Sequence, residues 1–116
     1  MNFTLPLPPP LNAVYKTGQG RFYKSKKAKD WEQEAYFVIK SQTRRYKSLQ
    51  ELTSPLYVGI TLFLKRDRDI DSSMKLLFDL LEDAGIIEND NLIEHLNIKK
   101  FMDKKNPRME IEIETL

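Results

Sequence analysis

The sequence contains no cysteine and a single histidine, His95. Without cysteine, disulfide bonds and thiolate metal sites are excluded, and one histidine argues against a histidine-rich zinc site. No segment approaches the roughly 20 apolar residues that are needed to cross a bilayer. The opening MNFTLPLPPPLN has neither a basic region nor a long apolar run, so we expect no signal peptide and a cytoplasmic protein.

What the chain does contain is a strong division of charge. Its 116 residues are enough for one domain with a modest core, and we expect a single domain over residues 1–116. Residues 1–66 carry 12 Lys and Arg against 4 Asp and Glu, whereas residues 67–116 carry 7 against 13. The basic first half fits a phosphate-binding surface. The alternative is that these side chains only solvate a helix face.

The spacing of apolar residues predicts an α+β domain, in which a mixed sheet packs against two main helices in the order β–α–β–α–β–β. LYVGITLFLKR is the strongest strand, because it is β-branched and apolar without a helical period. NAVYKTGQGRFYKS is expected to form an exposed loop or a loose hairpin. Phe3, Leu5 and Leu7 alternate, which predicts a short strand ended by Pro6 and Pro8-Pro9-Pro10, and further strands are expected around 56–66, 92–102 and 108–115. One helix of about twenty residues follows Ser25 as N-cap, and the other spans 72–84 and ends at Gly85.

Three aspartates alternate with other residues in KRDRDIDSSMK, directly after the strongest strand. In extended backbone, residues i and i+2 point to the same side about 6.6 Å apart, so Asp67, Asp69 and Asp71 can share one face. Two carboxylates about 5 Å apart repel by roughly 3 kcal/mol at an effective dielectric near 20. A cation is therefore expected between them. Mg²⁺ suits the site, because it takes carboxylate oxygens together with substrate phosphate oxygens.

Two further residues complete the candidate site. Asp90 lies in ENDN, after the second helix, where the chain turns back toward the sheet. Lys75 follows Asp71 by four residues, and it can lower carboxylate pKa values, hold a phosphate or stabilise transition-state charge. A metal ion that activates water and stabilises the leaving oxygen is then sufficient for phosphodiester cleavage.

Plainer interpretations of the same residues remain open. The KRDRD alternation is also typical of a solvated edge of paired charges. Asp71 can serve simply as a helix cap, and Lys75 as its ion-pair partner one turn later. Asp90 is also an ordinary turn residue, and Asp79 and Asp83 fit the wet face of the helix.

The order DIDSSMK, FDLLEDAG and NDNLI resembles the core of the RusA-type Holliday-junction resolvases, and LPLPPPLNAVYK resembles the proline-rich opening of that family. The resemblance covers most of the chain in the same order and at nearly the same spacing. It implies a Mg²⁺-dependent endodeoxyribonuclease of bacteria and prophages, with Mn²⁺ as a substitute metal, acting in DNA recombination and repair. It also implies a homodimer that makes two symmetric nicks across a four-way DNA junction.

The resemblance assigns roles to particular residues. Asp69, Asp71 and Asp90 are expected to bind the metal, and Lys75 is expected to assist cleavage. The basic residues near them are expected to contact DNA phosphates: Lys16, Arg21, Lys24, Lys26, Lys27, Lys65, Arg66 and Arg68. Phe22 or Tyr23 could pack near the junction centre or belong to the core.

Two positions depart from the pattern of the family. Ser72 stands where the family usually has Asn, and Asn89 stands where a second acidic residue would be no surprise. Serine still offers a cap or a hydrogen bond, but metal geometry or rate can differ. Three other functions stay open: a broader structure-selective DNA nuclease, a DNA-binding module without catalysis, in which the acidic half only adds solubility, and a protein-interaction domain that binds no nucleic acid.

Overall fold

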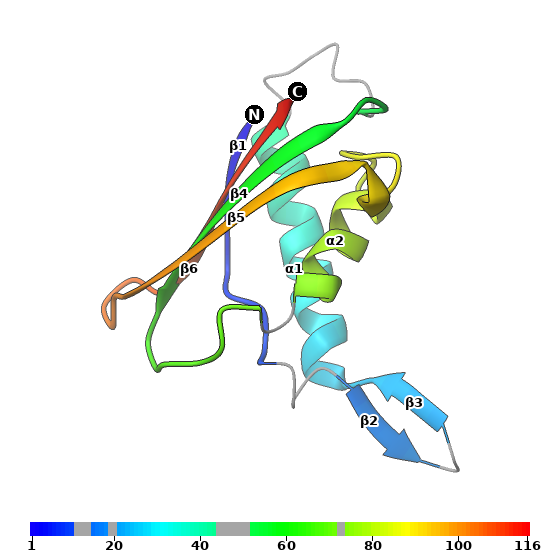
Figure 1. Ribbon diagram of the computed structural model, residues 1–116. Helices are drawn as coiled ribbons and strands as arrows, with labels where there is room; N and C mark the ends of the chain where they lie inside the picture. Colours follow the sequence, from blue (N-terminus) through cyan, green and yellow to red (C-terminus); the bar gives the residue numbers. More distant parts are fainter. Residues whose placement is uncertain (11–14, 19–20, 44–51, 72–73) are drawn as a thin grey trace.

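A computed structural model of the chain describes residues 1–10, 15–18, 21–43, 52–71 and 74–116, without the side chains of 15–18 and 21–23. Two α-helices and four strands form a two-layer α+β domain, and a separate two-stranded hairpin precedes the first helix (Figure 1). The elements are β1 Asn2–Leu5, β2 Tyr15–Gly18, β3 Arg21–Lys24, α1 Lys26–Thr43, β4 Leu56–Leu64, α2 Met74–Asp83, the short 3₁₀ helix η2 Asp90–Leu92, β5 Ile93–Met102 and β6 Arg108–Thr115. The predicted fold class and the order of its main elements are confirmed.

The main sheet is mixed and has the strand order β1-β6-β4-β5. β4 pairs in parallel with β5 and antiparallel with β6, while β1 pairs antiparallel with β6. The parallel pair requires a crossover, and α2 provides it, as expected for a β–α–β connection. β6 therefore lies inside the sheet although it is the last strand along the chain. Near the C-terminal end of β6, the Ile113 carbonyl accepts a hydrogen bond from the Met1 amino group at 3.0 Å.

Both helices cover the same face of this sheet (Figure 1). The strand side chains alternate accordingly, because every second residue of β4 is buried while those between are only partly covered. In β6, Met109, Ile111 and Ile113 are buried and the intervening glutamates are exposed, as predicted. No helix of the described residues covers the opposite face of the sheet.

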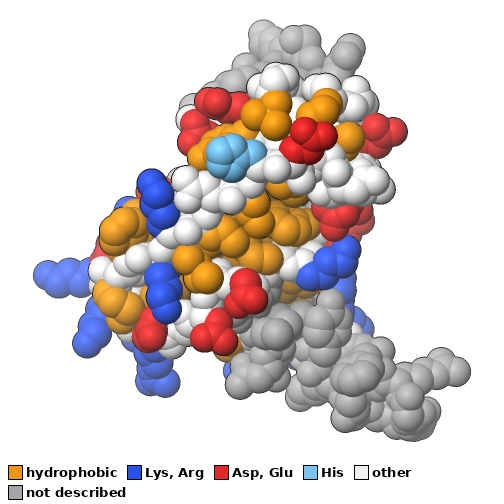
Figure 2. Space-filling view, in the orientation of Figure 1, with side chains coloured by type: hydrophobic (Ala, Val, Ile, Leu, Met, Phe, Trp, Pro, Cys, Tyr) orange, Lys and Arg blue, Asp and Glu red, His pale blue; other side chains and the backbone are white. Residues whose placement is uncertain are grey.

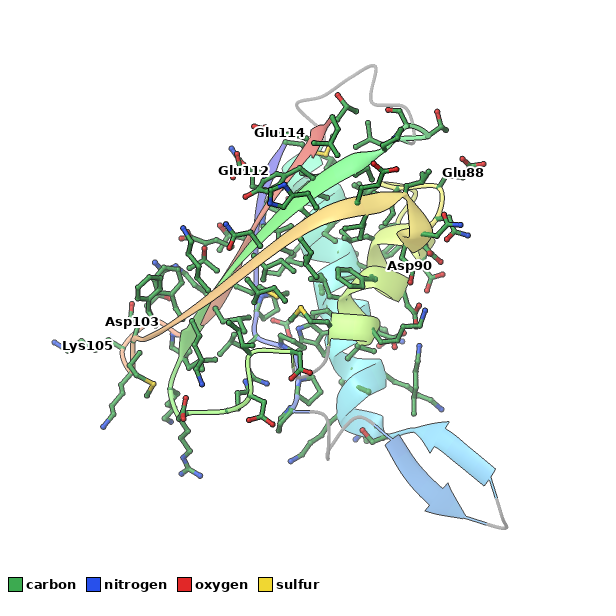
Figure 3. All side chains as sticks on the ribbon, viewed as in Figure 1. Glu88, Asp90, Asp103, Lys105, Glu112 and Glu114 are labelled. Carbon is green, nitrogen blue, oxygen red and sulfur yellow. The ribbon has the colours of Figure 1, made fainter. Side chains whose placement is uncertain are left out.

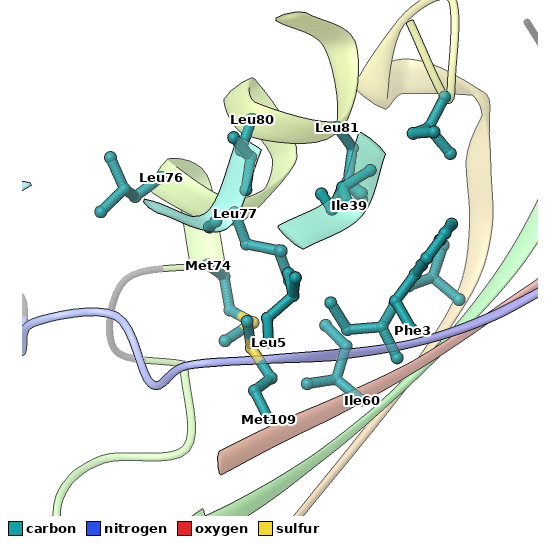
Figure 4. Close-up of a cluster of buried hydrophobic side chains, with 14 of the residues drawn as sticks. Phe3, Leu5, Ile39, Ile60, Met74, Leu76, Leu77, Leu80, Leu81 and Met109 are labelled. Atoms are coloured by element: carbon teal, nitrogen blue, oxygen red, sulfur yellow. The ribbon is translucent and has the colours of Figure 1, made fainter. Parts of the chain in front are cut away.

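The core lies between the sheet and the two helices (Figure 4). Side chains that are at most 2% exposed meet there from each layer: Phe3, Leu5, Ile39, Ile60, Leu77, Leu81, Met109 and Ile111. The burial of these apolar groups is the main favourable contribution to stability. None of the described helices is both long enough and apolar enough to cross a membrane.

Local signals at the helix ends match the structure. Ser25 caps α1, because its Oγ accepts a hydrogen bond from the Ala28 backbone N–H at 3.2 Å. Gly85 follows α2 with φ of 72°, a left-handed value that glycine adopts without strain. The Ile86 N–H then reaches back to the Leu81 carbonyl at 2.9 Å, and this bond completes the stop of the helix.

Candidate active site

The loop over residues 65–71 leaves β4 and is fixed at two points. Lys100 of β5 donates from Nζ to Asp67 Oδ1 and to the Arg68 carbonyl, each at 2.9 Å. Arg68 in turn donates from Nη1 to the Pro8 carbonyl at 2.6 Å. The proline-rich opening and the C-terminal end of strand β5 therefore hold this loop from two directions.

The pKa values of two loop residues, Asp67 and Arg68, are shifted from their ordinary values. The hydrogen bond from Lys100 lowers the pKa of Asp67 below its ordinary value, and the charge of the lysine adds to this effect. Burial lowers the pKa of the Arg68 guanidinium, which is only partly exposed. The Arg68 side chain, which is expected to contact DNA, thus already donates one hydrogen bond to the Pro8 carbonyl.

Asp69 and Asp71 come next, and both side chains are exposed. Neither carboxylate forms a hydrogen bond or ion pair with any residue that the structure describes. The Asp71 carbonyl accepts from the Met74 N–H at 3.3 Å, where α2 begins. These two aspartates are therefore available to a ligand from solvent.

On the first turn of α2, Lys75 bridges two carboxylates. Its Nζ lies 3.1 Å from Asp79 Oδ1 and 3.1 Å from Asp90 Oδ2. These two partners, Asp79 first, raise the pKa of Lys75 well above its ordinary value. The alternative in which Lys75 only pairs with Asp71 does not match this arrangement, because the lysine turns toward the later residues. Asp83 is exposed, as expected, whereas the Asp79 carboxylate forms an ion pair with Lys75.

Asp90 is held by its own backbone as well as by the lysine. Its N–H donates to Glu82 Oε1 at 2.6 Å, which ties the start of η2 to α2. Asn89 caps η2, because its Oδ1 accepts from the Asn91 N–H at 2.9 Å. Asn89 therefore has a structural role as the cap of η2. Figure 3 shows Asp90 beside α2, at the beginning of β5.

The structure brings Lys75 and Asp90 together, but it does not gather all three expected ligands. Among the described residues, no three Asp, Glu or His side chains lie close enough to hold a metal ion. The donor set nevertheless suits a hard divalent cation, since it consists of carboxylate oxygens and two of these groups have no partner among the residues that the structure describes. The assignment of Asp69, Asp71 and Asp90 as metal ligands stays a prediction.

The remaining predicted DNA contacts fall into three groups. Lys26, Lys27, Lys65 and Arg66 are exposed. Lys24 is partly buried and forms an ion pair with Glu32 at 2.7 Å. The side chains of Lys16, Arg21, Phe22 and Tyr23, and Ser72 as a whole, lie outside the described residues.

Three residues of the site were not predicted from the sequence to belong to it: Asp79, which was assigned only to the solvated face of the helix, Glu82 and Lys100. Asp79 and Glu82 follow Lys75 at i+4 and i+7, which places all three on one face of a helix, so this spacing was a usable signal. Lys100 gave no such signal, because its contact with Asp67 joins residues 33 positions apart.

Comparison with known proteins agrees with this picture. The family model described as endodeoxyribonuclease RusA matches residues 6–114. The chain therefore belongs to this family, and the expectation of a nuclease is confirmed.

The curated relatives carry one common name, crossover junction endodeoxyribonuclease RusA. The protein of Aquifex aeolicus (strain VF5) is 33% identical over 107 residues, which are 90% of this chain and 82% of the relative. The proteins of Escherichia coli (strain K12) and Shigella sonnei (strain Ss046) are each 27% identical over 114 residues, which are 97% of this chain and 92% of each relative.

Proposed function

We propose that this chain is a divalent-metal-dependent endonuclease that resolves four-way DNA junctions by paired, symmetric nicks. The observation that carries the proposal is the family match over residues 6–114, together with relatives named for crossover junctions. The exposed carboxylates after β4 and the Lys75–Asp90 pair supply chemistry that suits the cleavage of a phosphodiester.

The metal would be held by Asp69, Asp71 and Asp90, with Mg²⁺ as the expected ion and Mn²⁺ as a substitute. A divalent cation supplies Lewis-acid stabilisation of the phosphate and activates water for attack. The chain contributes placement, since Lys100 and Pro8 fix the loop before Asp69 while Glu82 fixes the backbone of Asp90.

Lys75 is proposed to act on the reacting phosphate. Its raised pKa keeps the side chain charged throughout the neutral range. A fixed positive charge beside a cleaved phosphodiester stabilises the negative charge that develops in the transition state. Asp79 gives Lys75 a second anchor, so the ammonium group stays in place if the Asp90 carboxylate turns to a metal ion.

The DNA substrate would lie across residues from both halves of the chain. The predicted contacts near the hairpin and α1 are Lys16, Arg21, Lys24, Lys26 and Lys27, and those beside the aspartates are Lys65, Arg66 and Arg68. DNA recombination and repair, in a bacterium or a prophage, is the setting that fits this substrate. The cytoplasm, where bacterial DNA lies, is the matching compartment.

The first test is a cleavage assay on a synthetic four-way junction with Mg²⁺ or with EDTA. Linear duplex and flap DNA are parallel substrates, and Asp71→Asn is the test variant. Asp83→Asn is the matched control, because it removes one exposed carboxylate of α2 that has no assigned role. We expect paired nicks that need Mg²⁺, disappear with Asp71→Asn and persist with Asp83→Asn.

Each other outcome selects a different function. Equal cutting of flaps and junctions would indicate a broader structure-selective nuclease. Tight junction binding without cutting in any divalent metal would indicate a DNA-binding module. In that case Asp71→Asn should bind DNA as well as the parent or better, because one negative charge facing the phosphates is removed.

A homodimer is part of the proposal, because two symmetric nicks call for two sites and a twofold assembly suits a nearly twofold junction. Sedimentation of the free protein should give about twice the 13.7 kDa chain mass. A monomer both alone and on the junction would contradict this part while leaving the nuclease activity intact.

A further inference from the structure

One corner of the molecule collects lysine and arginine side chains without carboxylate partners. It forms where β4 and β5 end side by side, since Leu64 is in register with Met102 and the Asp103 N–H donates to the Leu64 carbonyl at 2.8 Å. The residues of this basic corner are Lys65, Arg66, Lys99, Lys104 and Lys105. Figure 3 labels Lys105 at this end, and Figure 2 shows Lys and Arg side chains gathered there.

Internal cations offset most of the acidic charge of the corner, because Arg108 pairs with two of its carboxylates and Lys100 with the third. Asp103 pairs with Arg108 at 3.1 Å, and Glu110 pairs with the same guanidinium at 3.0 Å. Asp67 pairs with Lys100 at 2.9 Å. All five members of the basic corner are exposed, and none forms an ion pair with a described residue. A surface of this kind has an excess positive potential and attracts a polyanion.

An exposed aromatic side chain lies within the same surface. Phe101 is 53% exposed, and its ring stacks on Phe63 with a centroid distance of 5.9 Å. Behind it, the Arg108 guanidinium carbon lies 3.8 Å from the Phe63 centroid. Phe101 is thus supported from the protein side and open to solvent on the other. Aromatic groups among basic side chains are typical of surfaces that bind nucleic acid.

The basic corner is continuous with the proposed active site through one short loop. Lys65 and Arg66 begin the segment that carries Asp69 and Asp71. DNA that lies over these aspartates must leave the site in some direction, and the corner offers cations immediately upstream. Its carboxylates oppose this path only weakly, because each pairs with Arg108 or Lys100, and the five exposed cations of the corner outnumber the one negative charge left over.

We propose that the basic corner is a further DNA-binding surface, in which Lys99, Lys104 and Lys105 extend the contacts expected of Lys65 and Arg66 along a duplex arm. Phe101 packs against the sugars or bases of that arm. This proposal rests on the proposed junction nuclease activity. It adds residues of the β5 strand and the β5–β6 turn, which no DNA contact predicted from the sequence includes.

The test compares Lys104→Gln/Lys105→Gln with Lys104→Arg/Lys105→Arg, which keeps both charges at the same exposed turn. Fluorescence anisotropy measures the Kd for a four-way junction in EDTA over a series of salt concentrations. We expect the glutamine variant to bind more weakly and its salt slope to fall by about 2, one for each lost phosphate contact. The arginine variant should keep the parental slope.

Phe101→Ala gives an independent readout. It should weaken binding without a change in salt slope, because the lost contact is apolar rather than ionic. Parental Kd and slope in the glutamine variant would overturn the proposal, provided that the parent protein binds and cuts the junction. Failure of the parent itself would instead count against the proposed function.

Anionic phospholipid vesicles are the remaining control. Vesicle binding that is lost in the glutamine variant, while its junction affinity stays parental, would assign the corner to a membrane surface and overturn the proposal.

Discussion

The Glu82 carboxylate is the residue-scale feature that most directly sets the position of Asp90. It lies two helical turns after Lys75 and accepts the Asp90 N–H at 2.6 Å. The same aspartate meets Lys75 through its side chain at 3.1 Å. Backbone and side chain of Asp90 are therefore fixed by two different residues of one helix, and Glu82 acts as a positioning residue.

Glu82→Ala should weaken metal binding, whereas Glu82→Gln should not, because the glutamine oxygen can still accept the Asp90 N–H. Loss of a group that orients a metal ligand typically reduces metal affinity by about 10–100-fold. The measurement is the Mg²⁺ concentration that gives half-maximal cleavage. An alanine variant with the parental Mg²⁺ dependence, or a glutamine variant as impaired as alanine, would contradict this role.

The pH response of Lys75 is a second prediction at this scale. Its pKa is raised in the folded protein, so the ion pairs contribute stability fully below the ordinary lysine pKa. That contribution disappears only as pH rises through the higher, folded value. Lys75 therefore stays protonated across the neutral pH range, and we expect no loss of cleavage from its deprotonation there.

Asp79→Asn should lower the pKa of Lys75, since Asp79 is the largest contributor to its shift. NMR titration of the Lys75 side chain in parent and variant measures this directly. An unchanged midpoint would mean that Asp90 alone sets the ionisation of the lysine.

At the scale of elements, the loop over residues 65–71 depends on strands that are distant in sequence. Lys100 donates hydrogen bonds to the Asp67 carboxylate and to the Arg68 carbonyl, and the Arg68 side chain donates one to the Pro8 carbonyl. The exposed aspartates that follow are therefore carried on a restrained loop.

Lys100→Met should release this loop while it leaves β4 in place. We expect amide hydrogen exchange to rise about tenfold over residues 67–71, because their local opening becomes easier, and not over β4. Lys99→Met is the control, as Lys99 points to the opposite face of β5 and forms no ion pair with a described residue. Equal exchange in both variants would contradict the restraint.

Elements and site contacts differ in how far they could be predicted from the sequence. The long strands and both helices were predicted closely, because burial imposes regular spacing on Ile111, Leu77 and their neighbours. β1 ends at Leu5, directly before Pro6, as expected, since proline cannot donate to a strand pairing. The aspartates and Lys75 were marked by their spacing, but the partners of Lys100 and Lys75 depend on packing between distant segments. Local pattern does not specify such contacts.

At the scale of the whole molecule, the sheet and helices share one core, so unfolding should be a single transition. Ile111 lies in the inner strand β6 and is 2% exposed. Ile111→Ala should lower the free energy of unfolding by about 2–5 kcal/mol through lost burial and a cavity.

Urea unfolding followed by Trp31 fluorescence and by far-UV circular dichroism measures this effect. Trp31 is the only tryptophan, it is 5% exposed, and its Nε1 donates to the Pro6 carbonyl at 2.9 Å, so it reports on the α1 layer. Transitions that separate between the two signals would show that the layers unfold independently.

The inner position of β6 also has a consequence for synthesis. On the ribosome, β1 emerges before β6, its strand partner among the described residues. The nascent chain must therefore hold Phe3 and Leu5 without their sheet until residues 108–115 have left the exit tunnel. A DNA-cutting protein built in this order completes its main sheet only after β6 has emerged.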